Sequence, residues 1–325
     1  LTGFAQRTFT HVFQTPFYPE TETGKWRSPV TQSGIRGDIL SFVNSTSEPD
    51  DYDLKVAIAA AFYAFQLEDK VKMIHLNDVF EQDLDIWTKS PGLPWKGLGY
   101  RTKGDIKRDP DAVNRVRLFW HRIKNGDRLR APDCLAHVRS HVCDVNEEKI
   151  RAVWGYPGTI TFGEAVYALP LIRAYQAKQN PIAYGFETAL GGARKVFKRF
   201  AGPGFFAGLD FKSFDKTLPT WLIRKAFDIL ECNIDFVHYQ DHGIADARRN
   251  YRMWDYIQDY FINTTIRLAN GTRYRKSSGI ASGSYFTQLV GSVCNYILCA
   301  WMSLKQTGSL PQDILVLGDD SLIKT

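Results

Sequence analysis

Two short stretches of the sequence place carboxylates at the ends of apolar segments. LVLGDDSLI, from Leu315 to Ile323, puts Asp319 and Asp320 at the tip of a predicted apolar hairpin, where adjacent like charges repel. In LDFKSFD, Asp210 closes an apolar predicted strand and Asp215 follows five residues later. If the two strands are neighbours, Asp210 and Asp319 converge at one edge of a sheet. Converging carboxylates are the ligands that Mg²⁺ prefers, and two such ions promote phosphoryl transfer.

Each of these motifs also has a simpler interpretation. Gly-Asp-Asp is an ordinary turn sequence, and a single aspartate after a strand commonly caps a helix or a turn. The simpler interpretation weakens because both predicted strands, at Asp210 and at Gly318, end next to a carboxylate.

Two further motifs carry side chains that suit a nucleotide. SGIASGSYFT contains Ser282, Gly283 and Thr287, where glycine permits close backbone approach and hydroxyls can bond a sugar. Lys149 and Arg151 alternate along a predicted strand, so both point the same way and suit a triphosphate. Alone, the first motif is a common Ser/Gly loop and the second is an exposed basic strand.

Several elements must form to bring these residues together. The sequence predicts a buried strand at Phe205–Phe211 and a short strand at Glu147–Gly158. The capping-box pattern at Thr161–Glu164 predicts the start of a helix that reaches about Ala177. No charge lies between Lys276 and Lys305, but polar side chains interrupt this stretch, so a buried helix with a polar stripe is favoured over a membrane span.

The composition is that of a folded protein with a mildly basic surface. The chain has 325 residues, a formal net charge of +6, 44% hydrophobic residues and 14% aromatic residues. These values exclude general disorder and permit a polyanionic partner without requiring one. The five cysteines contain no CxxC pair, which favours a reduced intracellular setting over a disulfide framework. The chain lacks an initiator methionine, and we expect it to be an internal piece of a longer protein.

The order and chemistry of these motifs resemble the viral RNA-dependent RNA polymerases, most closely those of double-stranded RNA viruses of the partitivirus and picobirnavirus kind. YGFETALGG also resembles the partitivirus-like group. Five blocks match in the order of the family: SPGLPW (Ser90–Trp95), KIRAVWGYP (Lys149–Pro157), LDFKSFD (Leu209–Asp215), SGIASGSYFTQLVGSVCN (Ser278–Asn295) and LGDDS (Leu317–Ser321).

The resemblance implies an α/β (α+β) right-hand fold, with fingers, a palm built on a small antiparallel sheet, and the thumb missing from this chain. It divides the chain into an N-terminal extension with fingers (1–87), fingers with template and nucleotide-entry loops (88–204) and a partial palm (205–325). A fingers insertion is expected at about 231–276. The general-acid lysine of the family is expected after Thr325.

The resemblance also implies a role for individual residues. Asp210 and Asp319 would bind two Mg²⁺ ions, for which Mn²⁺ can substitute, with Asp320 supporting the site. The nucleotide would be bound by the following residues, of which Lys149 and Arg151 neutralise the triphosphate and the others recognise the ribose: Lys149, Arg151, Asp215, Ser282, Gly283, Thr287 and Asn295. The RNA strands would be guided by Ser90, Pro91 and Gly92.

One position departs from the pattern of many positive-strand RNA virus polymerases. They carry an asparagine one helical turn after the threonine, where this sequence has Gly291, and Asn295 follows a turn later. Which of the two positions faces the sugar is therefore open.

The expected function is RNA-directed RNA polymerisation, with RNA template and product, NTPs and viral capsid protein as partners. The expected location is the virion and the host cytoplasm, with no membrane span. One alternative is a reverse transcriptase, although a small acceptor at Asp215 favours ribonucleotides. Another is a non-catalytic RNA-binding or capsid-associated protein. A zinc site at His238 and His242 is disfavoured because Cys232 has no CxxC partner, so solvated histidines are expected.

Overall fold

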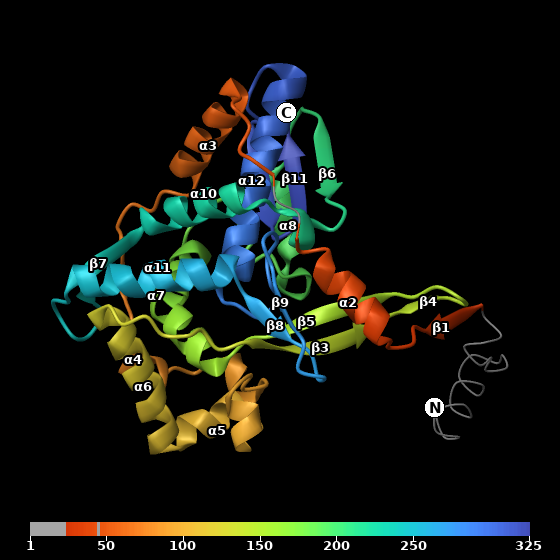
Figure 1. The fold of residues 1–325 in the computed structure, drawn as a ribbon. Helices are drawn as coiled ribbons and strands as arrows, with labels where there is room; N and C mark the ends of the chain where they lie inside the picture. The colour runs from red at the N-terminus through yellow and green to blue at the C-terminus, as the bar shows by residue number, and fades with distance from the viewer. Residues whose placement is uncertain (1–23, 44–45) are drawn as a thin grey trace. The chain divides into compact units, whose positions relative to one another are not determined.

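The computed structural model of the protein describes residues 24–43 and 46–325 and has the mixed α/β character expected (Figure 1). The first 23 residues, where the predicted N-terminal extension begins, lie outside the described residues. The described chain divides into two compact units. The smaller unit comprises residues 24–40 and 137–153, and the larger unit comprises 41–136 and 154–325. The division into fingers and palm predicted from the sequence stays a prediction.

The smaller unit holds Arg151, which lies on a strand, and Lys149, which directly precedes that strand. It contains β1 (Lys25–Arg27), α2 (Gln32–Leu40) and β4 (Val142–Asp144), with parts of β3 (Cys134–Ser140) and β5 (Ile150–Gly155). β1 and β4 pair antiparallel. The Lys149 N–H donates to Ser28 Oγ at 2.8 Å, and the Ala152 N–H donates to the Asp38 carboxylate at 2.8 Å. These bonds leave the Lys149 and Arg151 side chains exposed.

The larger unit is built around buried helices. Its helices are α3 (Tyr52–Ala64), α4 (Leu76–Val79), α5 (Lys103–Arg108), α6 (Pro110–Asn125), α7 (Gly158–Ala177), α8 (Gly192–Arg199), α9 (Phe214–Thr217), α10 (Thr220–Glu231), α11 (Ala247–Ile262) and α12 (Phe286–Thr307), with short 3₁₀ turns at Asp85–Thr88, Trp95–Leu98 and Thr188–Leu190. Its complete strands are β2 (Val71–Met73), β6 (Phe206–Asp210), β7 (Ile234–Tyr239), β8 (Thr265–Arg267), β9 (Arg273–Arg275), β10 (Asp313–Leu317) and β11 (Asp320–Lys324).

Helix α12 is the uncharged helix expected from the sequence, and it lies at the centre of the larger unit. It packs against α3, α10, β10 and β11 (Figure 1). Most of its apolar residues are buried, and so are the polar side chains of Ser292 and Asn295. Within the described residues, no helix combines the length and the apolar character needed to cross a membrane. Because Ser292 and Asn295 are buried on α12, they can form hydrogen bonds to the neighbouring backbone.

Two predictions about elements were wrong. Helix α7 begins at Gly158 rather than at Thr161, because the Pro157 carbonyl accepts the first helical N–H groups and Glu164 lies inside the helix. The predicted capping box is therefore absent. The strand predicted to be buried, β6, is largely exposed, because it is the edge strand of its sheet and pairs only with β11.

Candidate functional site

A three-stranded antiparallel sheet places the three aspartates at one edge. The strand order is β10-β11-β6, so β11 lies between the two strands whose carboxyl ends were expected to meet. Asp320 opens β11 and lies opposite Asp210, the last residue of β6. On its other side, Asp320 lies opposite Leu317, the last residue of β10. Asp319 belongs to the two-residue turn between β10 and β11, and the predicted convergence of Asp210 with the Gly-Asp-Asp turn is observed.

The three carboxylates create a locally negative edge. Burial raises the pKa of Asp320, and the negative charges of Asp319 and Asp210 raise it further. All three residues are exposed enough to meet a ligand. A cation placed at this edge would lower the repulsion among them, so the donor set suits a divalent ion that prefers oxygen ligands.

Side chains of α12 determine the position of the Gly-Asp-Asp turn. Gly318 has a φ of 65°, a left-handed conformation that glycine adopts without strain. Its N–H donates to Ser292 Oγ at 3.0 Å. The Asn295 amide donates to the carbonyls of Gly318 at 2.9 Å and Asp320 at 3.1 Å. Asn295 is fully buried, so in this structure its amide orients the turn, and its predicted contact with ribose stays a prediction.

Gly291, the position that departs from the pattern of many positive-strand RNA virus polymerases, also faces the turn. A Cβ built on Gly291 would lie 3.5 Å from the Cα of Gly318, an ordinary van der Waals distance. Ser292 was not among the predicted site residues. The signal that identifies it is the spacing of Gln288, Ser292 and Asn295, which places three polar residues on one face of an otherwise apolar helix.

The Ser/Gly loop before α12 packs on the end of β5 at Trp154. Ser282 Oγ accepts from the Trp154 N–H at 3.2 Å. Gly283 has a φ of 96°, and a Cβ there would lie 2.8 Å from the Trp154 carbonyl oxygen, which only glycine permits. Thr287 Oγ1 donates to the Ala281 carbonyl at 2.8 Å. Ser282 and Gly283 remain exposed, so the loop combines a fixed backbone with accessible groups.

Asp215 belongs to the short helix α9, which is joined to the same loop by backbone hydrogen bonds. The Asp215 carbonyl accepts from the Ile280 N–H at 2.6 Å, and the Leu218 carbonyl accepts from the Gly279 N–H at 2.7 Å. The Asp215 residue is exposed. The structure therefore connects the first aspartate motif with the Ser/Gly loop.

A buried carboxyl group that the sequence analysis missed fixes the other end of this loop. Glu164 of α7 has no exposed surface, and it accepts from Ser284 Oγ at 2.7 Å and from the Tyr285 N–H at 2.9 Å. Burial raises the pKa of Glu164 to about 8, although these two hydrogen bonds and the charge of Lys103 oppose the rise. Its sequence signal was misread as part of a capping box.

The residues predicted to guide RNA lie in a tightly packed loop. Ser90 is half-buried and its carbonyl accepts from Lys103 Nζ at 2.7 Å, while Pro91 and Gly92 are buried. The Pro91 carbonyl accepts from the Gly158 N–H at 2.7 Å. This packing leaves little surface of Pro91 and Gly92, and their contact with RNA stays a prediction.

The remaining predicted residues, Lys149 and Arg151, belong to the smaller unit. Both side chains are exposed, but only Arg151 lies on β5, which is shorter than the predicted strand and begins one residue after Lys149. Their contact with a triphosphate stays a prediction.

A wide depression of about 920 Å³ adjoins the aspartates. Among the residues that line it are Asp210 and Asp320 from the sheet and Gln288 from α12. Tyr184 and Phe186, from the segment between α7 and α8, also line it. That segment is the YGFETALGG motif, and it is joined to β10 because the Ala183 N–H donates to the Val316 carbonyl at 2.9 Å. The depression is large enough to admit a nucleotide-sized ligand beside the carboxylates.

Comparisons with known proteins agree with the motifs. A family model described as viral RNA-dependent RNA polymerase matches residues 48–325. The RNA-directed RNA polymerase of Cryptosporidium parvum virus 1 (strain KSU-1) is 31% identical over 244 residues, covering 72% of this chain and 42% of that protein. The RNA-directed RNA polymerase of White clover cryptic virus 1 is 26% identical over 208 residues, and that of Atkinsonella hypoxylon virus is 24% identical over 227 residues. Each of these two matches covers 58% of this chain and 34% of the relative. The chain thus spans less than half the length of these relatives.

Proposed function

Because the chain belongs to the viral RNA-dependent RNA polymerase family, we propose that the protein synthesises RNA on an RNA template during replication of a double-stranded RNA virus. The predicted resemblance to this family is confirmed. The observation that carries the proposal is the alignment of Asp210, Asp319 and Asp320 at one edge of a small antiparallel sheet.

In the proposed reaction, the 3′-hydroxyl oxygen of the RNA attacks the α-phosphorus of an NTP paired with the template. A new P–O bond forms, the bond to the bridging oxygen of the β-phosphate breaks, pyrophosphate leaves, and the hydroxyl proton is released. Asp210, Asp319 and Asp320 would hold two Mg²⁺ ions or their Mn²⁺ substitutes. When bound, such ions favour deprotonation of the attacking hydroxyl and neutralise charge on the leaving pyrophosphate.

The protein's own residues supply position and selectivity in this proposal. Ser292 and Asn295 keep the turn in one conformation, so Asp319 and Asp320 need no rearrangement when the nucleotide arrives. Asp215 and Ser282 would accept or donate hydrogen bonds at the ribose, supported by the fixed loop. Lys149 and Arg151 would neutralise the triphosphate.

We also propose the wider arrangement that the family implies. Residues 205–325 would form a partial palm in a right-hand fold, with fingers before it and an insertion at about 231–276. RNA, NTPs and viral capsid protein would be the partners. The protein would act in the virion and the host cytoplasm.

Ribonucleotide incorporation on an RNA template tests the proposal. The complete protein should incorporate NTPs with Mg²⁺ and not with EDTA, and Asp319→Asn should abolish synthesis while leaving the folded state intact by circular dichroism. Synthesis that the variant retains would remove the turn from the site. RNA binding without synthesis by the wild type would favour a non-catalytic RNA-binding protein.

The same assay separates ribonucleotide from deoxyribonucleotide synthesis. The exposed, small acceptor at Asp215 favours NTPs over dNTPs, and Asp215→Tyr should reduce that preference by placing a bulky ring near the 2′ position. A wild-type preference for dNTPs would instead identify a reverse transcriptase.

A further inference from the structure

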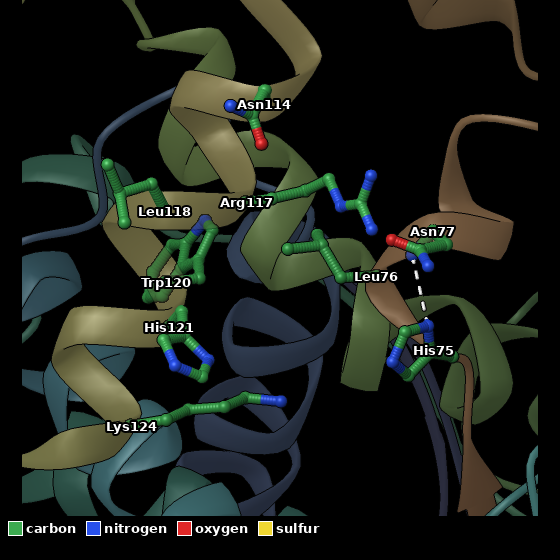
Figure 2. Close-up of a pocket in the computed structure, with 9 residues that line it drawn as sticks. All are labelled: His75, Leu76, Asn77, Asn114, Arg117, Leu118, Trp120, His121 and Lys124. Atoms are coloured by element: carbon green, nitrogen blue, oxygen red, sulfur yellow. Dashed lines mark hydrogen bonds between the residues drawn. The ribbon is translucent and has the colours of Figure 1, made fainter.

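A second pocket lies in the larger unit, away from the aspartates. It has a volume of about 410 Å³ and lies between helix α6 and the segment that leads into α4 (Figure 2). In Figure 1, α4 and α6 lie at the lower end of the larger unit, whereas β6 and β11 lie at its upper end. The pocket is therefore separate from the carboxylate edge.

The walls of this pocket are basic. Arg117, His121 and Lys124 lie on one face of α6, because their spacing of four and three residues matches the helical repeat. Figure 2 shows Arg117 and Lys124 extending across the hollow toward the opposite wall, where His75 and Asn77 lie. Among the described residues that line the pocket there is no carboxylate.

Neighbouring groups hold two of these side chains in place. Lys124 Nζ donates to the Tyr239 hydroxyl at 2.9 Å and lies 5.5 Å from the centre of that ring. His121 Nδ1 lies 3.2 Å from an Arg249 guanidinium nitrogen, which adds a further cation beside the pocket. Burial lowers the pKa of His75, and the charges of His242, Lys124 and Arg117 lower it further, although Asp78 opposes them. The pocket thus has cationic walls whose charges are not neutralised within it.

We propose that this pocket binds a phosphate group of RNA. A guanidinium, an ammonium and the Asn77 and Asn114 amides form a donor set that matches phosphate oxygens. The phosphate chemistry follows from the pocket itself, whereas RNA as its source rests on the proposed function. A free nucleotide carries the same group, so the experiment must separate the two sources.

The histidines near this pocket also have a geometry that suits a metal ion. Among the described residues, His75, Asp78 and His242 form the one set of three ligand atoms that lie within 4.8 Å of one another. However, Asp78 already pairs with His242 at 2.8 Å, and Lys124 and Arg117 raise the free energy of adding a cation beside His75. An anion is therefore favoured over a cation.

The histidines of the disfavoured zinc site are exposed to solvent, as the sequence predicted. The His238 and His242 side chains are 43% and 42% exposed, and each also pairs with a carboxylate, His242 with Asp78 and His238 with Asp235 at 2.7 Å. Cys232 is not part of the His75 set.

Binding of a fluorescently labelled single-stranded RNA to the complete protein tests the proposal. Arg117→Gln combined with Lys124→Gln should weaken RNA binding about tenfold and reduce the slope of log affinity against log salt by about 1. The matched control is Arg108→Gln combined with Arg122→Gln. It removes the same charge from α5 and α6 at exposed arginines outside the pocket, and it should change neither quantity beyond about twofold.

Labelled NTP binding, measured with the same two double variants, identifies the source of the phosphate. Loss of RNA affinity with unchanged NTP affinity is expected. Loss of NTP affinity alone would overturn RNA as the ligand, and equal behaviour of the pocket and control variants would overturn the site. The phosphate site would also be overturned if the wild type binds zinc, His75→Ala abolishes that binding, and the pocket double variant binds RNA as tightly as the wild type. Asp319→Asn should bind RNA like the wild type, so failure of the polymerase proposal is distinguishable from failure of this one.

Discussion

Asp320 lies directly opposite Asp210 across the β11–β6 pair, at the point where the sheet ends. Two like charges at opposed positions in an antiparallel pair destabilise the sheet. Asp319 in the adjoining turn adds to the effect on Asp320, whose pKa is raised by burial and by both neighbouring carboxylates. A structural role alone would favour an amide or a hydroxyl at one of these positions, so the arrangement indicates that a ligand offsets the repulsion.

Asp320→Asn should therefore stabilise the metal-free protein near neutral pH. Because the pKa of Asp320 is raised in the folded state, the wild type loses stability as pH rises through that pKa, and the variant does not. We expect a gain of about 0.5 kcal/mol in the free energy of unfolding in EDTA, which disappears below about pH 3. Urea unfolding at several pH values measures it.

With Mg²⁺ the wild type should become more stable than Asp320→Asn, because a bound ion stabilises the folded wild type more than a variant that has lost a ligand. The melting temperature of the wild type should therefore rise more with added Mg²⁺ than that of Asp320→Asn. Equal shifts for the two proteins would mean that Asp320 does not contribute to ion binding.

Gly318→Ala should reduce RNA synthesis more than its effect on stability explains. The change forces an alanine to adopt a φ of 65° and places its Cβ 3.2 Å from the Gln288 amide, which would shift the Gly-Asp-Asp turn. We expect destabilisation of about 1 kcal/mol. Gly308→Ala is the matched control, since Gly308 has a φ of 73° with open space around it at the end of α12. If both variants lose stability and synthesis equally, the turn has no special role.

The sequence predicts the carboxylate edge because the signal is local. Asp210 and Gly318 each end an apolar run, and the period of a strand determines where such a run ends. The order of the strands depends on long-range pairing, so the position of β11 between β6 and β10 could not be predicted in the same way. The exposure of β6 has the same origin, because an apolar run looks alike in an edge strand and in a central strand.

The contacts of individual polar residues were harder to predict than the elements. Asn295 was predicted to bind the nucleotide, with its contact to the sugar left open. The sequence did not indicate that its amide hydrogen-bonds to the turn, which it does because α12 packs directly against β10 and β11. Glu164 was assigned to a helix start from its spacing to Thr161, although it contacts a loop that follows more than a hundred residues later. Only the folded structure reveals such partners.

Asn295→Ala should destabilise the protein by about 1–3 kcal/mol, because it leaves the Gly318 and Asp320 carbonyls without their donor. RNA synthesis should fall at temperatures where circular dichroism shows the variant folded. Asn263→Ala is the control, since among the described residues its side-chain amide donates to the Asp259 carboxylate, one helical turn earlier. Normal synthesis by a folded Asn295→Ala variant would show that the turn does not need this residue.

Glu164→Gln should change the pH dependence of stability. A carboxyl group whose pKa rises from 4.5 to about 8 on folding costs stability progressively as pH rises through that range, by at most about 1.4 kcal/mol per pH unit. Glutamine does not titrate, so the stability of the variant relative to the wild type should increase from about pH 5 to 8. Above that range the stabilities of the two proteins should depend on pH in the same way. Urea unfolding of both proteins across this range measures the difference, and parallel profiles throughout would mean that Glu164 is ionised when buried.

Glu164→Ala removes the acceptor for both Ser284 and Tyr285. Comparing it with Glu164→Gln separates the effect of the loop's position from the effect of the Glu164 charge. The free energy of unfolding of the alanine variant should be lower than that of the wild type by about 2 kcal/mol or more, since the substitution also leaves a cavity. In the polymerase assay it should raise the KM for NTPs, because Ser282 lies in the same loop and Thr287 lies in the first turn of α12, which follows it. Glutamine should restore the KM, since its amide can donate to Ser284 Oγ while its oxygen accepts from the Tyr285 N–H. Failure of glutamine to restore it would mean that the negative charge, rather than the loop's position, is what matters.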